Sequence, residues 1–275
     1  MSSSLLKAAS LFIKPQDYTT HKIAGLKEGD RVVIVNDVHI PFADFPVLDA
    51  VETFFADFKP TIEVYNGDII DFYSCSHFDQ NPSRVFNLQD ELSAGKAWFA
   101  RRVKANPTAR RFFVQGNHED RLRRFLWADG SKLSSLKCLE IESLLGLAEF
   151  NIHTIPYGSR YDMAGFIIEH GYRAAKSAAF PANVARIMAI ERGSSGLCGH
   201  DHRAQTYSWA DSRGGHCWLN NGCLCLTSLE YAPTPGWQQA FTFGYIHEKR
   251  FHPTLVIPHD HHGFVANGRY YKIGG

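Results

Sequence analysis

The sequence predicts a mixed α/β fold in which two β-sheets belong to one domain. Strands and helices alternate in the first half of the chain, whereas strands cluster from Phe166 onward with one helical interruption around 182–190. No internal repeat, low-complexity run or Pro/Gly-rich linker divides the 275 residues. We therefore expect residues 1–28 to form an N-terminal extension and residues 29–275 to form a single domain, with the strands of the second sheet concentrated in 205–275.

The first half of the chain alternates β-branched runs with amphipathic stretches. The run RVVIVN follows the turn-forming Glu28-Gly29-Asp30, as a buried strand would, and Pro60 ends a helical pattern that starts near Asp44. Two strands joined by such a helix favour parallel pairing. The pattern predicts strands at 31–36, 61–66 and 111–115, and helices at 44–59, 88–103, 120–128 and 132–150.

The second half of the chain is rich in short apolar runs bounded by turn residues. Their length and spacing are typical of strands rather than helices. The expected strands are 166–169, 196–198, 207–210, 216–219, 223–227, 241–247 and 254–257.

Composition excludes several classes of protein. Hydrophobic residues make up 44% and charged residues 21% of the chain, which is ordinary globular usage, and the net charge of +1 gives no bulk attraction to polyanions. No apolar run reaches the ~18–20 residues of a membrane span, and the N-terminus lacks a basic leader, so we expect a soluble cytoplasmic protein. The six cysteines form no CxxC pair. Reduced buried thiols are the favoured interpretation, and a zinc knuckle built from Cys217, Cys223 and Cys225 is the alternative.

Polar residues follow five of the expected strands, at the point where each strand ends. In α/β sheets ligands bind in the crevice outside these carboxyl ends, so we expect the groups to converge. Carboxylates, an amide and imidazoles in one crevice call for a cation, and this mixture suits Mn²⁺, Fe or Zn²⁺ better than Ca²⁺ or Mg²⁺. The residues are Asp37, His39, Asp68, Asp71, Asn117, His118, Glu119, His170, His200 and His202.

Five short blocks within these loops carry a family resemblance. Asp37-Val38-His39, Gly67-Asp68, Gly116-Asn117-His118-Glu119, His170 and Gly199-His200-Asp201-His202 stand in the order and approximate spacing of the DxH, GD, GNH(D/E), H and GHxH blocks of calcineurin-like metallophosphoesterases. The segments GNHEDRLRR (116–124) and GHDHR (199–203) also resemble phage and prophage members of that family. The resemblance implies a four-layered α/β/β/α sandwich and, for a phage protein, action in the host cytoplasm.

The resemblance also implies a dinuclear metal centre. Asp37, His39, Asp68 and His202 would bind one ion, and Asp68, Asn117, His170 and His200 the other, so that Asp68 bridges them. Mn²⁺ is the expected metal, with Fe and Zn²⁺ as alternatives. Such a pair holds a hydroxide that attacks phosphorus. His118 matches the family's non-ligating histidine, which stabilises the phosphoryl group or protonates the leaving oxygen, and Glu119 is expected to orient its imidazole and raise its pKa.

Several neighbouring residues have competing interpretations. Asp71 is expected to cap a following helix, and Asp201 to point away from the metals because neighbours alternate along an extended segment. Arg121, Arg173 and Arg203 are candidate substrate-binding residues, since arginine binds phosphate bidentately. For the loop containing Tyr73, His77 and Phe78, packing is favoured over base stacking. The run 259–262 (HDHH) is expected to form a turn between strands that binds added metal adventitiously.

Together these features favour a phosphodiesterase acting on nucleotides or nucleic acid. The alternatives are a phosphomonoesterase and a non-catalytic scaffold with the same fold. A protein phosphatase is less attractive, because Phe72 and Tyr73 follow Asp71 where that class has a GDxxDRG block. A complete ligand set and an intact His118 weigh against a scaffold, although a fold alone never establishes activity.

Overall fold

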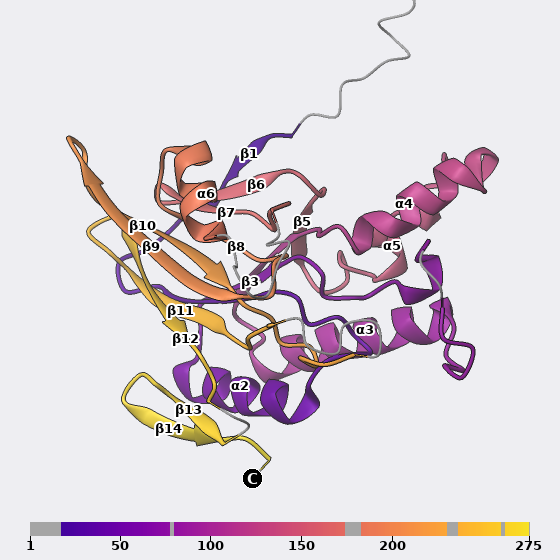
Figure 1. Cartoon of the computed structure of the whole chain (residues 1–275), viewed down its shortest axis with the longest axis horizontal. Coiled ribbons are helices and arrows are strands. Elements are labelled where there is room, and N and C mark those ends of the chain that lie inside the picture. Colours follow the sequence, from indigo (N-terminus) through magenta and orange to yellow (C-terminus); the bar gives the residue numbers. More distant parts are fainter. Residues whose placement is uncertain (1–17, 78–79, 174–182, 230–235, 260–261, 275) are drawn as a thin grey trace, which may run out of the picture.

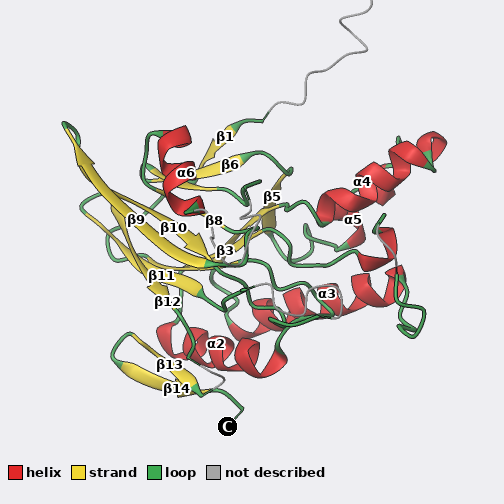
Figure 2. Cartoon of the chain, in the orientation of Figure 1, coloured by secondary structure: helices red, strands yellow, loops and turns green. Residues whose placement is uncertain are grey.

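The computed structural model of the chain describes residues 18–77, 80–173, 183–229, 236–259 and 262–274. Two six-stranded mixed sheets lie face to face at its centre. Helices α2 and α3 cover the outer face of one sheet and α6 covers the outer face of the other, as Figure 1 and Figure 2 show. The predicted α/β fold with two mixed sheets in four layers is confirmed.

The first sheet contains the three parallel strands expected in the first half of the chain. β2, β3, β4 and β5 run parallel, β11 pairs antiparallel with β2, and β12 pairs antiparallel with β11. The strands in spatial order are β12 (Arg250–Val256), β11 (Phe241–His247), β2 (Arg31–Val35), β3 (Ile62–Asn66), β4 (Arg110–Val114) and β5 (Ile152–Ile155).

The second sheet mixes parallel and antiparallel pairs. β9 and β10 form a long antiparallel hairpin, whereas β8 pairs in parallel with both β7 and β10. The strands in spatial order are β1 (Thr20–Lys22), β6 (Arg160–Met163), β7 (Phe166–Ile168), β8 (Gly196–Cys198), β10 (Gly214–Asn221) and β9 (Ala204–Asp211). A separate hairpin of β13 (Gly263–Ala266) and β14 (Arg269–Lys272) packs on α2.

Helices α2 and α3 each begin at a residue whose side chain caps the helix. The Asp44 side chain accepts the Val47 N–H at the start of α2, and Asn87 and Asp90 form a capping box at the start of α3; a cap of this kind contributes about 1 kcal/mol. The α-helices are α2 (Phe45–Phe58), α3 (Leu88–Ala105), α4 (Glu119–Ala128), α5 (Ile141–Leu144) and α6 (Val184–Arg192), and the 3₁₀ turns are η1 (Tyr73–Cys75), η2 (Ser131–Leu133) and η3 (Lys137–Leu139).

Three apolar layers hold the sandwich together. The first lies between the α2/α3 pair and the first sheet, and its aromatic centre is Phe54, packed on Phe241 and Phe243. The second lies between the sheets, and the third joins α6 to Trp218 of β10. Because the outer face of each sheet is covered by helix and the inner faces cover one another, the strand ends are left as the open edge at which loops can build a site.

Three sequence expectations about the fold are wrong. The 132–150 stretch is not one helix but η2, η3 and α5, because its apolar residues do not share a buried face: Leu133 and Leu136 are exposed. The 223–227 stretch is not a strand: it forms only isolated bridges, with the Leu224 and Leu226 N–H groups bonded to the loop after β2 and the Cys223 N–H bonded to Gln238. The second-sheet strands are not concentrated in 205–275, because β11 pairs with β2 and β12 with β11 in the first sheet.

The expected N-terminal extension is partly integrated in the fold. Its residues Thr20–Lys22 form β1 against β6, and Ile23 is buried between the sheets. Residues 1–17 lie outside the described part of the chain, as do Asp260 and His261 of the HDHH run; His259 and His262 form a backbone turn between β12 and β13. No helix in the described residues is long and apolar enough to cross a membrane.

Candidate metal centre

Five loops bring the chemistry-bearing residues to one edge of the sandwich. Three follow β2, β3 and β4 of the first sheet, and two follow β7 and β8 of the second. Five of the predicted ligands in these loops adopt left-handed backbone conformations that non-glycine residues rarely take, at a cost on the order of 1–3 kcal/mol each. They are Asp37, His39, Asp68, His200 and His202, with φ between 50° and 70°. Backbone strain that is concentrated at the predicted metal ligands supports a functional role for this edge of the sandwich.

Two glycines are required for the loops to approach one another. A Cβ on Gly116 would overlap Asp68 Oδ1, and a Cβ on Gly199 would lie 2.5 Å from Asp37 Oδ2. Neither clash can be relieved without moving a predicted ligand. The glycines that precede Asn117 and His200 are therefore explained by close packing against the carboxylates.

The first group of ligand atoms lies at the end of β2. His202 Nε2 is 2.9 Å from Asp37 Oδ1 and 3.1 Å from His39 Nε2, which is itself 3.6 Å from Asp37 Oδ1. Asp68 Oδ2 is 3.9 Å from His39 Nε2. Ligands that bind one transition-metal ion with bonds of about 2.1 Å are separated by roughly 3 Å, so the Asp37, His39 and His202 atoms are spaced as ligands of a common ion, with Asp68 beside His39.

The second group shares Asp68 with the first. His170 Nε2 lies 3.2 Å from Asp68 Oδ2 and 3.0 Å from Asn117 Oδ1. His200 Nδ1 lies 2.6 Å from the same amide oxygen. The structure thus brings all seven predicted ligands together as two sets of four with Asp68 in both.

The donor chemistry of the two groups fits a cation. His39 Nδ1 donates to Asp71 and His170 Nδ1 donates to the Asn66 carbonyl, so the Nε2 lone pair of each ring faces the ligand group. Asp37 Oδ1 is buried and accepts no hydrogen bond from any described residue. When these rings are neutral, their lone pairs and the facing carboxylate oxygens repel, and either a proton or a divalent ion between them removes that repulsion.

Electrostatics keep the carboxylates ionised. Burial acts to raise the pKa of Asp37 and Asp68, but the neighbouring imidazoles outweigh it and hold both pKa values well below the ordinary range. Burial acts to lower the pKa of His170, but Asp68 outweighs it and raises the pKa to about 9. Burial lowers the pKa of His200 to about 4. At neutral pH a metal ion entering the second group therefore displaces a proton from His170.

The role expected for Asp71 as a helix cap is wrong. Its buried carboxylate lies 2.9 Å from His39 Nδ1, 3.3 Å from His118 Nδ1 and 3.1 Å from Arg121 Nη1. The 3₁₀ turn that follows has no side-chain cap, and the next α-helix, α3, starts only at Leu88. Asp71 instead holds a predicted ligand, the candidate acid and an arginine in one network. The GDxxD spacing was the sequence signal for this role.

His118 lies beside the metal groups rather than within either set of four. Its Nε2 is 3.8 Å from Asp68 Oδ2 and accepts a hydrogen bond from Arg121 Nη2 at 3.0 Å, while its Nδ1 donates to the Asp71 carbonyl at 2.9 Å. Burial lowers the pKa of the imidazole. The ring is therefore neutral at rest, with its Nε2 directed to the side of the metal centre.

Glu119 does not contact the His118 imidazole, contrary to the expectation that it orients that ring. Its carboxylate accepts the backbone N–H groups of Asp68, Ile69, Ile70 and Gly116 at 2.7–3.0 Å. Burial raises the pKa of Glu119 to about 7. The side chain points inward because it begins α4, so it clamps the β3 and β4 loops together instead of reaching the site.

The three candidate substrate arginines have different surroundings. Arg121 contacts His118 and Asp71 at the site. Arg173 is exposed and pairs with Glu191, away from the ligands. Arg203 is buried and pairs with Asp201, which also accepts from Asn220, so this acid points away from the metal groups as alternation predicted. Only Arg121 of the three is placed to meet a phosphoryl group.

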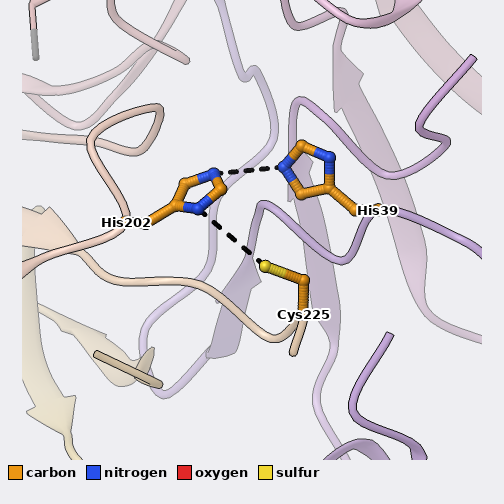
Figure 3. Close-up of side chains that lie close together, drawn as sticks. All are labelled: His39, His202 and Cys225. Atoms are coloured by element: carbon orange, nitrogen blue, oxygen red, sulfur yellow. Dashed lines mark hydrogen bonds between the residues drawn. The ribbon is translucent and has the colours of Figure 1, made fainter. Parts of the chain in front are cut away.

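Cys225 lies beside the first metal group, as Figure 3 shows. Its Sγ is 3.9 Å from His202 Nδ1, and it could join His39 and His202 as a ligand set. A hydrogen bond with Cys223 and burial raise its pKa, so it is a neutral thiol. Cys217 packs instead in the core between the sheets, so the three cysteines of the zinc-knuckle interpretation do not gather. No sequence pattern pointed to Cys225 as a neighbour of His202.

The aromatic loop after β3 packs rather than opening toward the site. The Tyr73 ring contacts Phe42 and Phe86, and the Arg84 guanidinium lies over Phe42 and Tyr73. Phe78 lies outside the described residues. These contacts agree with the packing interpretation of Tyr73.

Comparison with known proteins gives two phage relatives. The chain is 28% identical over 243 residues to the Gene 54 protein of Mycobacterium phage D29, covering 82% of this chain and 92% of that protein. It is 27% identical over 261 residues to the Gene 54 protein of Mycobacterium phage L5, covering 88% and 99%. No protein-family model matches the chain.

Solved structures resemble the chain more distantly. Vacuolar protein sorting 29 from Cryptosporidium parvum matches with a TM-score of 0.43 and 12% identity, covering 89% of this chain and 95% of that one. A dimetal phosphatase from Danio rerio matches with a TM-score of 0.43 and 14% identity, covering 84% and 96%. Vps29 from Chaetomium thermophilum matches with a TM-score of 0.44 and 9% identity, covering 89% and 99%.

Proposed function

We propose that this protein is a metallophosphoesterase of the calcineurin-like class, which hydrolyses a phosphodiester with two divalent metal ions. The observation that carries the proposal is the pair of four-atom ligand groups that share the Asp68 carboxylate. The two groups would hold two divalent ions through one shared carboxylate, the ligand arrangement that two-metal hydrolases use. The two phage relatives support action in the cytoplasm of an infected bacterial cell.

The metal pair, when bound, supplies an activated water as nucleophile and charge neutralisation at phosphorus. The chain's own residues do the rest. Arg121, 3.0 Å from His118 Nε2, can donate to a phosphoryl oxygen that enters beside the imidazole. Only the protonated form of His118 can act as the acid: once Arg121 has turned to the phosphoryl oxygen, the proton on His118 Nε2 passes to the leaving oxygen, and the Asp71 oxygens at Nδ1 stabilise that imidazolium beforehand.

The test is metal-dependent hydrolysis. Protein stripped with a chelator is expected to show no turnover of bis(p-nitrophenyl) phosphate, and Mn²⁺ is expected to restore it, with Fe²⁺ and Zn²⁺ as alternative metals. Comparison with p-nitrophenyl phosphate separates a diesterase from a monoesterase. Full metal occupancy without turnover of either ester would favour the scaffold alternative and overturn the proposal.

Replacement of Asp71 by asparagine tests the network that orients the ligands. A neutral amide at this position has a single acceptor oxygen, so it could not accept from both His39 and Arg121 as the two carboxylate oxygens do, and Asp71→Asn is expected to weaken metal binding about 10–100-fold. Equilibrium dialysis against Mn²⁺ measures the change. Asp44→Asn is the matched control, because this buried acid lies outside the site and asparagine also caps helices. Equal affinity in wild type and Asp71→Asn would show that Asp71 does not orient a ligand.

A further inference from the structure

A cavity of about 330 Å³ adjoins the metal centre on the side of the second sheet. It lies between the β5–β6 loop and the end of β7, and we call it the tyrosine cavity because Tyr157 and Tyr172 line it together with Ser159, Arg160, His170 and Arg192. His170 connects the cavity to the metal centre, because it lines the cavity and its Nε2 belongs to the second ligand group. A molecule in the cavity would therefore lie against a residue of the proposed metal centre.

Two polar groups in the cavity wall lack partners in the described part of the chain. Ser159 is only 1% exposed, yet its hydroxyl makes no hydrogen bond there. Arg160 Nε is also buried and unpartnered, and no ion pair to the guanidinium exists among the described residues. Arg192, across the cavity, is by contrast bonded to both oxygens of Glu169, at 2.6 and 2.8 Å. Buried polar groups are nearly always satisfied, so this wall is suited to an anionic ligand that accepts from Arg160 and Ser159.

The aromatic side of the cavity is suited to a planar ring. Tyr157 meets His170 edge to face, with 6.3 Å between ring centroids. Burial raises the Tyr157 pKa to about 12, so its hydroxyl remains a neutral donor. Tyr172 is already engaged, because its hydroxyl donates to Glu191 and the Arg173 guanidinium lies 4.8 Å from the ring centroid. Tyr157 is thus the ring available for stacking.

We propose that the tyrosine cavity binds the nucleotide next to the scissile phosphodiester, with its base against Tyr157 and its further phosphate on Arg160 and Ser159. This inference rests on the proposed phosphoesterase function and narrows its substrate to a short single-stranded, 5′-phosphorylated oligonucleotide. A volume near 330 Å³ is at the small end of ligand sites and suits one nucleotide rather than a base pair. A net charge of +1 also provides little grip on duplex DNA.

The experiment compares the dinucleotides pTpT and TpT as substrates of the Mn²⁺-loaded full chain. The wild type is expected to prefer pTpT in kcat/KM, and Arg160→Gln is expected to reduce that preference about 10–100-fold because a hydrogen-bonded charge pair is lost. Arg160→Lys keeps the charge without the bidentate geometry and should retain part of the preference. Tyr157→Leu is expected to lower kcat/KM for both dinucleotides about tenfold through lost stacking.

The control variant is Arg213→Gln, which removes the same charge from the β9–β10 hairpin, where Arg213 pairs with Asp211. Its pTpT preference should equal that of the wild type. The cavity proposal is overturned if the wild type hydrolyses both dinucleotides equally well, or if Arg160→Gln keeps the full preference while thermal unfolding shows an intact fold. Methyl p-nitrophenyl phosphate has neither a base nor a second phosphate, so it reports the phosphoesterase activity without the cavity. If the wild type hydrolyses neither this ester nor either dinucleotide, the phosphoesterase function itself is overturned.

Discussion

Replacement of Asp68 by alanine is expected to lower phosphodiester hydrolysis by about 10³-fold or more and to release bound metal from both ligand groups. Asp68 Oδ2 lies 3.2 Å from His170 Nε2 and 3.9 Å from His39 Nε2, so this carboxylate reaches a histidine of each set. Each metal ion contributes several kcal/mol of transition-state stabilisation, and each ~1.36 kcal/mol is tenfold in rate. Metal content by mass spectrometry and turnover of bis(p-nitrophenyl) phosphate measure the two losses.

The control for Asp68→Ala must be a buried acid in the same region. Asp201 lies between two predicted ligands in sequence, but its carboxylate pairs with Arg203 and accepts from Asn220. Asp201→Asn is therefore expected to keep wild-type metal content. The Asp68 carboxylate also accepts a hydrogen bond from the backbone N–H of His118, so its loss could disturb the loop. Thermal unfolding must therefore show that the variant is folded. A folded Asp68→Ala protein that retains two equivalents of metal would contradict the shared-carboxylate geometry.

The candidate site was predictable where chemistry is encoded in short, ordered blocks at strand ends. Asp37, Asn117 and His200 each follow a strand that local β-branched or apolar runs define, and parallel strands bring their carboxyl ends to one edge. The roles of side chains were harder. Glu119 is a carboxylate next to His118 in sequence, which made it a candidate partner of the imidazole. At the start of α4, however, its side chain points toward four backbone N–H groups, and no local sequence pattern predicts that direction.

Long-range packing decided what the sequence could not. Arg160 stands at the start of a four-residue strand, β6, and becomes notable only because its neighbours leave its Nε without an acceptor. The pairing of β11 with β2 joins residues some two hundred positions apart, which strand periodicity cannot specify. Lys132 to Phe150 had helical spacing of leucines, yet Gly146 in a left-handed conformation and exposed Leu133 and Leu136 show that tertiary burial overrode the pattern.

Replacement of His118 by alanine is expected to lower turnover by about 10²–10⁴-fold while leaving metal content unchanged. His118 has no place in either set of four ligands, and its imidazole is held at the side of Asp68 by the Asp71 oxygens and Arg121. The loss should depend on the leaving group. An alkoxide needs a proton to depart, whereas p-nitrophenolate does not, so a dinucleotide should be affected far more than bis(p-nitrophenyl) phosphate.

The pH profile distinguishes proton donation by His118 from a structural role. Burial lowers its pKa, so the protonated acid is lost as pH rises through a value below the ordinary histidine range. Wild-type hydrolysis of a dinucleotide should therefore show a descending limb on the alkaline side, and His118→Ala should lack it. Exposed His252 on β12 supplies the control, since His252→Ala should keep the limb. If His118→Ala instead loses metal, His118 acts as a metal ligand together with His39 and Asp68, whose ligand atoms lie close enough to bind one ion. The proton for the leaving group must then come from solvent.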